Sequence, residues 1–126
     1  MMQHILAVAV GGGIGAALRY AVTLLANAHG GVVFPYGTVL VNIVGSFLIG
    51  LLMMYFQAQA DLTPSVKLFA VTGVLGGFTT FSTFNMELLT FIRAGEMGFA
   101  LLYGGLNVVG AFLFCWLGLA AGTALW

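Results

Sequence analysis

Four long apolar segments, separated by short polar stretches, make up almost the whole sequence. They cover about residues 3–26, 37–58, 65–93 and 97–125, and a helix that crosses the hydrocarbon core of a bilayer takes roughly 20 apolar residues. The alternation of polar and apolar residues that a membrane β-strand requires is absent from them. The pattern predicts an all-α integral membrane protein with four transmembrane helices, one domain over residues 1–126, and both termini on one side.

The residues between the segments are typical of loops. Pro35 and Pro64 are the only two prolines, and both lie between apolar segments, where a residue that breaks helices belongs. A cleaved signal peptide is the alternative for the first segment, because Ala26-Asn27-Ala28 has the small-x-small pattern of a cleavage site. However, the first four residues contain no Lys or Arg and Arg19 interrupts the apolar run, so we interpret this segment as a membrane helix.

The composition identifies lipid as the solvent of this chain. Hydrophobic residues make up 62% and charged residues 5%, whereas soluble domains have about 25% charged residues. A soluble domain of this size leaves too much surface in water to hide so many apolar side chains. The formal net charge of zero gives no basic face for nucleic acid, and the single cysteine, Cys115, excludes a disulfide scaffold or a multi-cysteine metal site.

The few basic residues do not set an orientation in the membrane. Lys67 lies on the side of the two termini, whereas Arg93 lies on the other side and Arg19 lies in the helix that leads there. Orientation normally follows an excess of Lys and Arg in cytoplasmic loops. Because neither side has a clear excess, we predict a dual-topology protein that forms an antiparallel homodimer. Glycines in the first, second and fourth segments favour close helix contacts, either within one subunit or between two.

Polar residues recur at helical spacing within the apolar segments. Thr38, Asn42 and Ser46 are four residues apart in the second segment, and Tyr103 and Asn107 are four apart in the fourth. Residues at this spacing share one face of a helix. Polar groups at membrane depth are costly and usually face protein, water or a pathway, so we predict a polar path for a transported solute. Hydrogen bonds that only join helices are the alternative.

The third segment contains a predicted helix break. A Gly76-Gly77 pair is followed by Thr79 and Thr80, which predicts a break near residues 76–80. Carbonyl groups freed inside a membrane need a partner, and broken transporter helices commonly offer them to a cation. After the break, Phe81 and Phe84 are three residues apart and would share a face. Their electropositive ring edges can contact a small anion without holding it as a full charge would.

Two charged residues within the spans each have two alternative roles. Arg19 either attracts anions to a vestibule or anchors the structure. Glu87 either pairs with the region of the phenylalanines or lies at the water boundary. The sequence contains no nucleophile–base pair, P-loop or paired carboxylates, and nothing argues for an enzyme.

Three blocks of sequence carry a resemblance to a known family. They are Gly11-Gly12-Gly13-Ile-Gly15-Ala-Ala-Leu-Arg19-Tyr20, Gly37-Thr38-Val-Leu-Val-Asn42-Ile-Val-Gly45 and Gly76-Gly77-Phe78-Thr79-Thr80-Phe81-Ser82-Thr83-Phe84. With them the chain resembles, over essentially its whole length, the Fluc (CrcB) family of fluoride channels. The resemblance implies a passive, electrogenic, fluoride-selective channel in the inner (plasma) membrane that lowers cytoplasmic fluoride. It also implies an antiparallel dual-topology homodimer with two pores.

The resemblance further assigns roles to particular residues. It implies a structural sodium ion at the dimer interface, held by the backbone carbonyls of Gly76 and Thr79 from both subunits. Ala111 occupies a further position of the polar track, but its side chain cannot form a hydrogen bond. The residues expected along the fluoride pathway are Thr38, Asn42, Ser46, Phe81, Ser82, Phe84, Tyr103 and Asn107.

Two other functions fit a small four-span protein. A proton-coupled multidrug exporter of dual topology needs an acidic residue deep in the first helix, and that segment has none. A non-transporting membrane subunit would assemble with another protein and conduct no ions. The expected partners of this chain are therefore fluoride, the lipid bilayer and a second copy of itself, and no nucleic acid.

Overall fold

The computed structural model describes residues 1–30 and 34–126, and these residues are helical without any strand. The loop expected between the first two spans includes Gly31, which lies outside the described residues. The elements in chain order are α1 (Met2–Gly30), α2 (Tyr36–Ala58), α3 (Pro64–Lys67), the π-helical segment η1 (Leu68–Leu75), α4 (Gly76–Phe78), α5 (Ser82–Arg93), α6 (Met97–Gly105), the π-helical segment η2 (Leu106–Gly110) and α7 (Ala111–Leu125).

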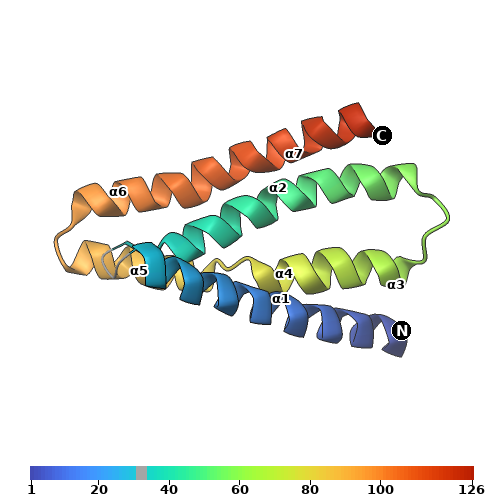
Figure 1. Ribbon diagram of the computed structural model, residues 1–126, viewed down its shortest axis with the longest axis horizontal. Helices are drawn as coiled ribbons and strands as arrows, with labels where there is room; N and C mark the ends of the chain where they lie inside the picture. Colours follow the sequence, from blue (N-terminus) through green and yellow to red (C-terminus); the bar gives the residue numbers. More distant parts are fainter. Residues whose placement is uncertain (31–33) are drawn as a thin grey trace.

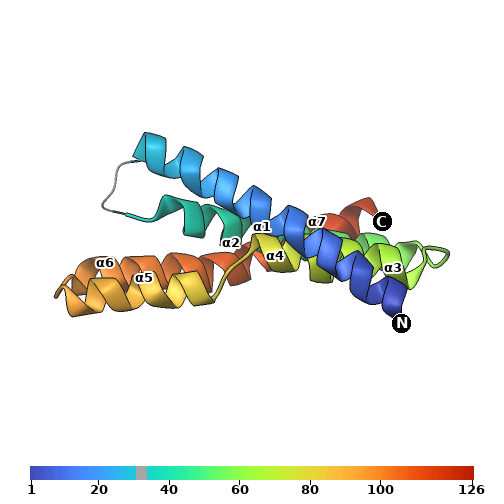
Figure 2. The ribbon, with the colours of Figure 1, turned by 90° about the horizontal axis from the view of Figure 1, so that it is seen from below.

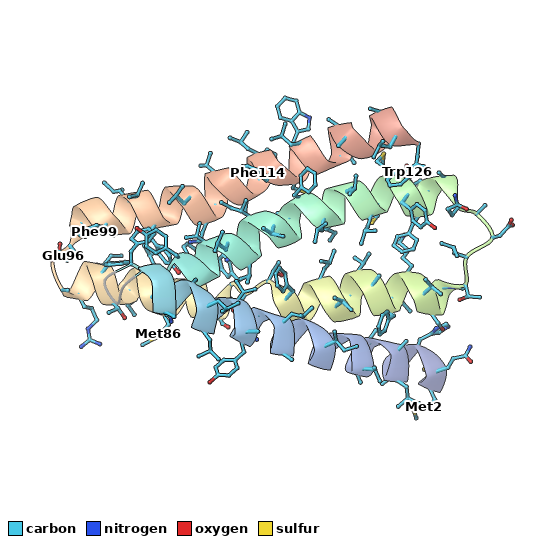
Figure 3. All side chains as sticks on the ribbon, viewed as in Figure 1. Met2, Met86, Glu96, Phe99, Phe114 and Trp126 are labelled. Atoms are coloured by element: carbon cyan, nitrogen blue, oxygen red, sulfur yellow. The ribbon has the colours of Figure 1, made fainter. Side chains whose placement is uncertain are left out.

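The elements form four antiparallel spans, as the sequence predicts. Four helices are long and apolar enough to cross a membrane: Met2–Ala28, Tyr36–Ala58, Pro64–Arg93 and Met97–Leu125. Both termini lie at the same end of the molecule (Figure 1). Met2 and Trp126 lie at that end, whereas Glu96 and Phe99 lie at the opposite end, where α5 connects to α6 (Figure 3).

The spans associate in two close pairs, and glycines lie between the members of each pair. The first span packs along η1 and α4, and the second packs along α7 (Figure 1). A Cβ added at Gly11 would lie 2.5 Å from the carbonyl oxygen of Phe69, and one at Gly77 would lie 2.5 Å from that of Gly12. A Cβ added at Gly118 would be at least as crowded, because it would meet the carbonyl group of Phe47 in α2. Backbones in contact at glycines therefore hold the pairs together, as is common in membranes.

The third span is broken, but the break begins later than the glycine pair. Gly76 and Gly77 belong to α4, and the chain becomes extended at Thr79, with φ −84° and ψ 159°. The next helix begins at Ser82, and Figure 2 shows the linker between α4 and α5. The glycines are thus needed for the contact with α1, while the threonines form the break.

Aromatic side chains form the core at the end of the molecule where α5 meets α6. Phe34, Phe84 and Tyr103 are buried. The rings of Phe34 and Tyr103 meet edge to face with centroids 5.5 Å apart, and Phe84 contacts Tyr103 at the same distance. This packing fixes the position of Tyr103, whose ring reaches the polar groups described below.

The outer faces of the spans are apolar and exposed. Leu101 is 74% exposed, Phe112 72% and Trp116 63%. In water such a surface would drive aggregation, whereas in a bilayer it contacts lipid tails at no cost. The described surface thus agrees with a multi-pass membrane protein.

Candidate functional site: a polar chain at the break of the third span

The break is stabilised by side chains that replace helical hydrogen bonds. The last helical bond before it runs from the amide of Thr79 to the carbonyl of Leu75, at 3.1 Å. The next amide, of Thr80, donates to Oδ1 of Asn42 at 2.8 Å instead of continuing the helix. The hydroxyl of Thr80 then accepts the amide of Thr83 at 3.2 Å, which caps the start of α5 as threonine commonly does.

Asn42 connects three of the four spans. Besides accepting the Thr80 amide, its Nδ2 donates to the carbonyl of Thr80 at 3.0 Å and to Oδ1 of Asn107 at 2.7 Å. Nδ2 of Asn107 in turn donates to the carbonyl of Tyr103 at 3.1 Å. The second, third and fourth spans therefore meet in one network at the level of the break.

Glu87 continues this network toward the end where α5 meets α6. Its Oε1 accepts the hydroxyl of Thr38 at 2.6 Å and the phenol of Tyr103 at 2.7 Å. A carboxylate at membrane depth is costly unless it is hydrogen-bonded, and these two donors supply that stabilisation. Glu87 is therefore part of the polar chain that joins the second, third and fourth spans.

A cavity of about 400 Å³ opens where the break meets the second and fourth spans. It brings together five of the expected pathway residues with the two expected cation ligands. Thr38, Tyr103 and Ser82 do not line it, and the Ser82 hydroxyl is exposed, 3.5 Å from that of Thr80. The lining residues are Asn42, Gly45, Ser46, Ile49, Val71, Leu75, Gly76, Thr79, Thr80, Phe81, Phe84, Asn107, Val108 and Ala111.

Phe81 and Phe84 both border the cavity, in very different surroundings. Their ring centroids lie 5.5 Å apart. Phe84 is 3% exposed and packs in the aromatic core, whereas Phe81 is 69% exposed. Phe81 is the N-cap residue of α5 and has right-handed helical backbone angles, φ −91° and ψ −35°, and its carbonyl accepts the amide of Asn85 at 2.9 Å. The pair offers one fixed ring and one ring on the open side of the cavity.

The break leaves carbonyl groups without a helical donor. In a continuous helix the Thr80 amide would donate to the carbonyl of Gly76, but it donates to Asn42. The Thr83 amide likewise donates to the Thr80 hydroxyl and not to the carbonyl of Thr79. The structure gives neither carbonyl a donor among the described residues. Carbonyls of this kind are what unwound membrane helices present to sodium, so these residues fit a cation site.

Arg19 is the hydrogen-bond donor to another carbonyl freed at the break, that of Gly77. Its Nε donates to the carbonyl of Gly77 at 3.0 Å, across the close contact between α1 and α4. The side chain is partly buried. This contact favours the anchoring role of Arg19 over an ion-attracting one.

Sequence reasoning missed two members of this site. Thr80 was expected only as part of the break, yet its backbone and hydroxyl make four of the hydrogen bonds there. The role of Glu87 was left open. The only signal in the sequence was its charge: an acidic residue inside a span, one turn after Phe84, points inward more often than to lipid.

Comparisons with known proteins show the family of this chain. A family model described as CrcB-like protein, Camphor Resistance (CrcB), matches residues 6–119. A protein of Acinetobacter baumannii named fluoride-specific ion channel FluC is 44% identical over 121 residues, which cover 96% of this chain and 94% of the relative. Proteins of the same name from Acidobacterium capsulatum and Flavobacterium psychrophilum are 42% and 40% identical, and each alignment covers 94% of this chain and at least 94% of the relative.

Proposed function

The chain belongs to the CrcB-like family, and from that membership we propose that it is a fluoride-specific ion channel of the plasma membrane. Relatives that share 40–44% of its residues carry that name. The chain is therefore a transport protein and not an enzyme. The observation that carries the proposal is the polar chain from Glu87 to Asn42, which ends at the cavity bordered by Phe81 and Phe84.

The pathway uses neutral donors and ring edges. The hydroxyl groups of Thr38 and Tyr103, whose hydrogens are donated to Glu87 in this structure, mark one end of the polar chain, and the amides of Asn42 and Asn107 lie at the cavity. Fluoride is small and strongly hydrated, so a narrow path must replace its water with donors. Donors without a full positive charge let the ion leave again, which conduction requires. Selectivity over chloride follows from the narrowness of the path and the short reach of these donors.

The physiological role follows from the acid chemistry of fluoride. Hydrogen fluoride is a weak acid that crosses membranes and dissociates in a more alkaline cytoplasm, where the anion is trapped. A passive channel lets the anion leave, and an inside-negative potential contributes about 2.3 kcal/mol per charge per 100 mV. An electrogenic channel therefore lowers cytoplasmic fluoride without an energy source of its own.

Liposomes that contain the purified protein and potassium fluoride test this function. A fluoride electrode should record release only after valinomycin is added, because potassium must leave with the anion. Chloride in matched liposomes should stay inside. Equal release of chloride would contradict selectivity, and fluoride release without valinomycin would contradict electrogenic conduction. Release that depends on a proton gradient would instead support the exporter, and no release at all would support a non-transporting subunit.

The conducting form we propose is an antiparallel homodimer with two pores. The cavity is open on one side in the single subunit, and Phe81 lies there with 69% of its surface exposed. Gly76 and Asn85, on the same broken span, are also exposed, and an amide such as that of Asn85 is costly against lipid. A second subunit covering this face would complete both cavities.

The orientation of the subunits can be tested with added charge. Lys67 and Arg93 lie near opposite ends of the third span and give almost no bias. Two lysines inserted beside Lys67 should fix one orientation and abolish fluoride release, and coexpression with a variant trapped the other way should restore it. Wild-type termini that all map to one side of the membrane would contradict dual topology.

We also propose a structural sodium ion between the two subunits. Gly76 and Thr79 border the cavity, and their carbonyls have no donor within residues 1–30 and 34–126. Two antiparallel copies would present four such oxygens. The purified protein should unfold at a lower temperature in sodium-free buffer, and sodium should reverse the change where potassium does not. Identical unfolding temperatures in both salts would contradict the site.

A further inference from the structure

The threonine at which the third span leaves its helix is held by contacts on two sides. The amide and the hydroxyl of Thr79 both donate to the carbonyl of Leu75, each at 3.1 Å. A hydroxyl that bonds four residues back restricts the rotamers open to a threonine side chain. The methyl group then has a fixed direction, and it lies at Gly45 of α2. Thr79 is thus held by its own helix on one side and by the second span on the other.

Gly45 is buried and leaves just enough room for this methyl group. A Cβ added at Gly45 would overlap Cγ2 of Thr79 and would lie 3.4 Å from Cδ2 of Phe78. The methyl could move aside only if the Thr79 side chain rotated, which would take its hydroxyl away from Leu75. Otherwise α2 and α4 would have to separate. The observed conformation of Thr79 therefore depends on the lack of a side chain at position 45.

Thr79 is also the residue at which the backbone turns. Its φ of −84° is close to helical, whereas its ψ of 159° is extended. The ψ angle sets the direction of the carbonyl of the same residue, and in residues 1–30 and 34–126 this carbonyl has no donor. Because the rotamer of a side chain is coupled to its backbone angles, a forced rotation of Thr79 would also shift this carbonyl. Both Gly45 and Thr79 border the cavity.

We propose that Gly45 is a positioning residue of the break, which receives the methyl group of Thr79 and thereby sets the direction of the Thr79 carbonyl. This inference rests on the channel function and the cation site proposed above. Gly45 lies three residues after Asn42, on the same face of α2, so this face holds Thr79 by packing and Thr80 by hydrogen bonds. The alternative is that Gly45 only allows two helices to approach each other.

A size exchange between the two residues separates these readings. The variants are Gly45→Ala, Thr79→Ser and their combination. Thr79→Ser keeps the hydroxyl that bonds Leu75 and loses only the methyl group, so it makes room for a Cβ at position 45. Gly50→Ala, alone and with Thr79→Ser, is the matched control. Its Cβ would meet the carbonyl group of Cys115 at least as closely, in the same helix but against α7.

The unfolding temperature of the purified protein is measured over a range of sodium concentrations, and fluoride release is measured from liposomes. Gly45→Ala should raise the sodium concentration that gives half of the stabilisation about tenfold, the effect of weakening one contact to a charged group, and should slow release. Adding Thr79→Ser should return both values to those of Thr79→Ser alone. Gly50→Ala should lower the unfolding temperature but keep the sodium dependence of the wild type, and Thr79→Ser should not rescue it.

Unchanged sodium dependence in Gly45→Ala would overturn the inference, and so would equal rescue of both glycine variants by Thr79→Ser. Where Gly45→Ala does not fold, the double variant decides, because it should fold and respond to sodium. A wild type that does not respond to sodium refutes the cation site, and rescue of fluoride release by Thr79→Ser then decides the contact. A wild type that releases no fluoride refutes the proposed function, and rescue of the unfolding temperature then decides it.

Discussion

Gly77 offers a sharp test of how the break is held against the first span. A Cβ at this position would lie 2.5 Å from the carbonyl oxygen of Gly12 and 3.1 Å from the amide nitrogen of Ala16. Both atoms belong to backbone and cannot rotate away. Because ordinary contact begins at 3.4 Å, Gly77→Ala requires α1 and α4 to separate by about 0.9 Å.

The expected cost of that separation has two parts. Overpacking of a well-packed contact typically costs about 1 to 3 kcal/mol. In addition, Nε of Arg19 donates to the carbonyl of Gly77 at 3.0 Å, and a shift of this size lengthens that bond beyond useful range. We therefore expect Gly77→Ala to lower the free energy of unfolding by about 2 to 4 kcal/mol and to reduce fluoride release.

Unfolding of the detergent-solubilised protein, followed by intrinsic fluorescence, measures the loss of unfolding free energy. Fluoride release from liposomes measures the loss of transport. Gly13→Ala is the matched control, since a Cβ there meets no atom within 4 Å. Alanine is favoured over glycine inside a helix by roughly 0.5 to 1 kcal/mol, so this variant should be at least as stable as the wild type. Equal stability of Gly77→Ala and the wild type would refute the close contact.

The other predictions concern the hydrogen bonds of the polar chain. Tyr103→Phe and Thr38→Val each remove one of the two donors to Glu87, so each should lower the free energy of unfolding by about 1 to 3 kcal/mol and slow fluoride release; wild-type values in both assays would contradict the bonds. Glu87→Gln keeps an oxygen acceptor for both hydroxyls, so it should lose less stability than Glu87→Leu in the same unfolding assay. Arg19→Lys keeps the charge but lacks the planar guanidinium, and its unfolding should show a loss of about 1 kcal/mol; wild-type stability with reduced release would support a vestibule role instead.

The sequence was sufficient to predict the four spans, the shared side of the termini and a break in the third span. These three features depend only on the length of the apolar segments and on the residue types within them, and both can be read directly from the sequence. The break begins after the glycine pair, at Thr79, because of two contacts that the sequence does not show. Gly77 is needed for contact with α1, and the amide of Thr80 is drawn away from the helix by Asn42, a residue 38 positions distant.

The hydrogen-bond partners of the polar residues could not be predicted from their spacing in the sequence. Helical periodicity placed Thr38 and Asn42 on one face, but it does not give the rotation of one helix against another. The bond between Thr38 and Glu87 joins residues 49 positions apart. The π-helical segment η2, which contains Asn107, also adds a change of register that no simple pattern of polar residues displays.

The pairing of the spans has a consequence for the order of assembly during synthesis. The first span packs along the third, and the second along the fourth, so neither close pair is formed by neighbours in the chain. When the first two spans have entered the membrane, Gly11 has not yet met the backbone of η1, and Gly50 has not yet met the backbone of α7. A fragment that ends in the second loop therefore contains no complete pair. The second helix pair can form only after the last helix is made. We therefore expect a truncated chain with two spans to be degraded, because it cannot form a stable half-sized domain.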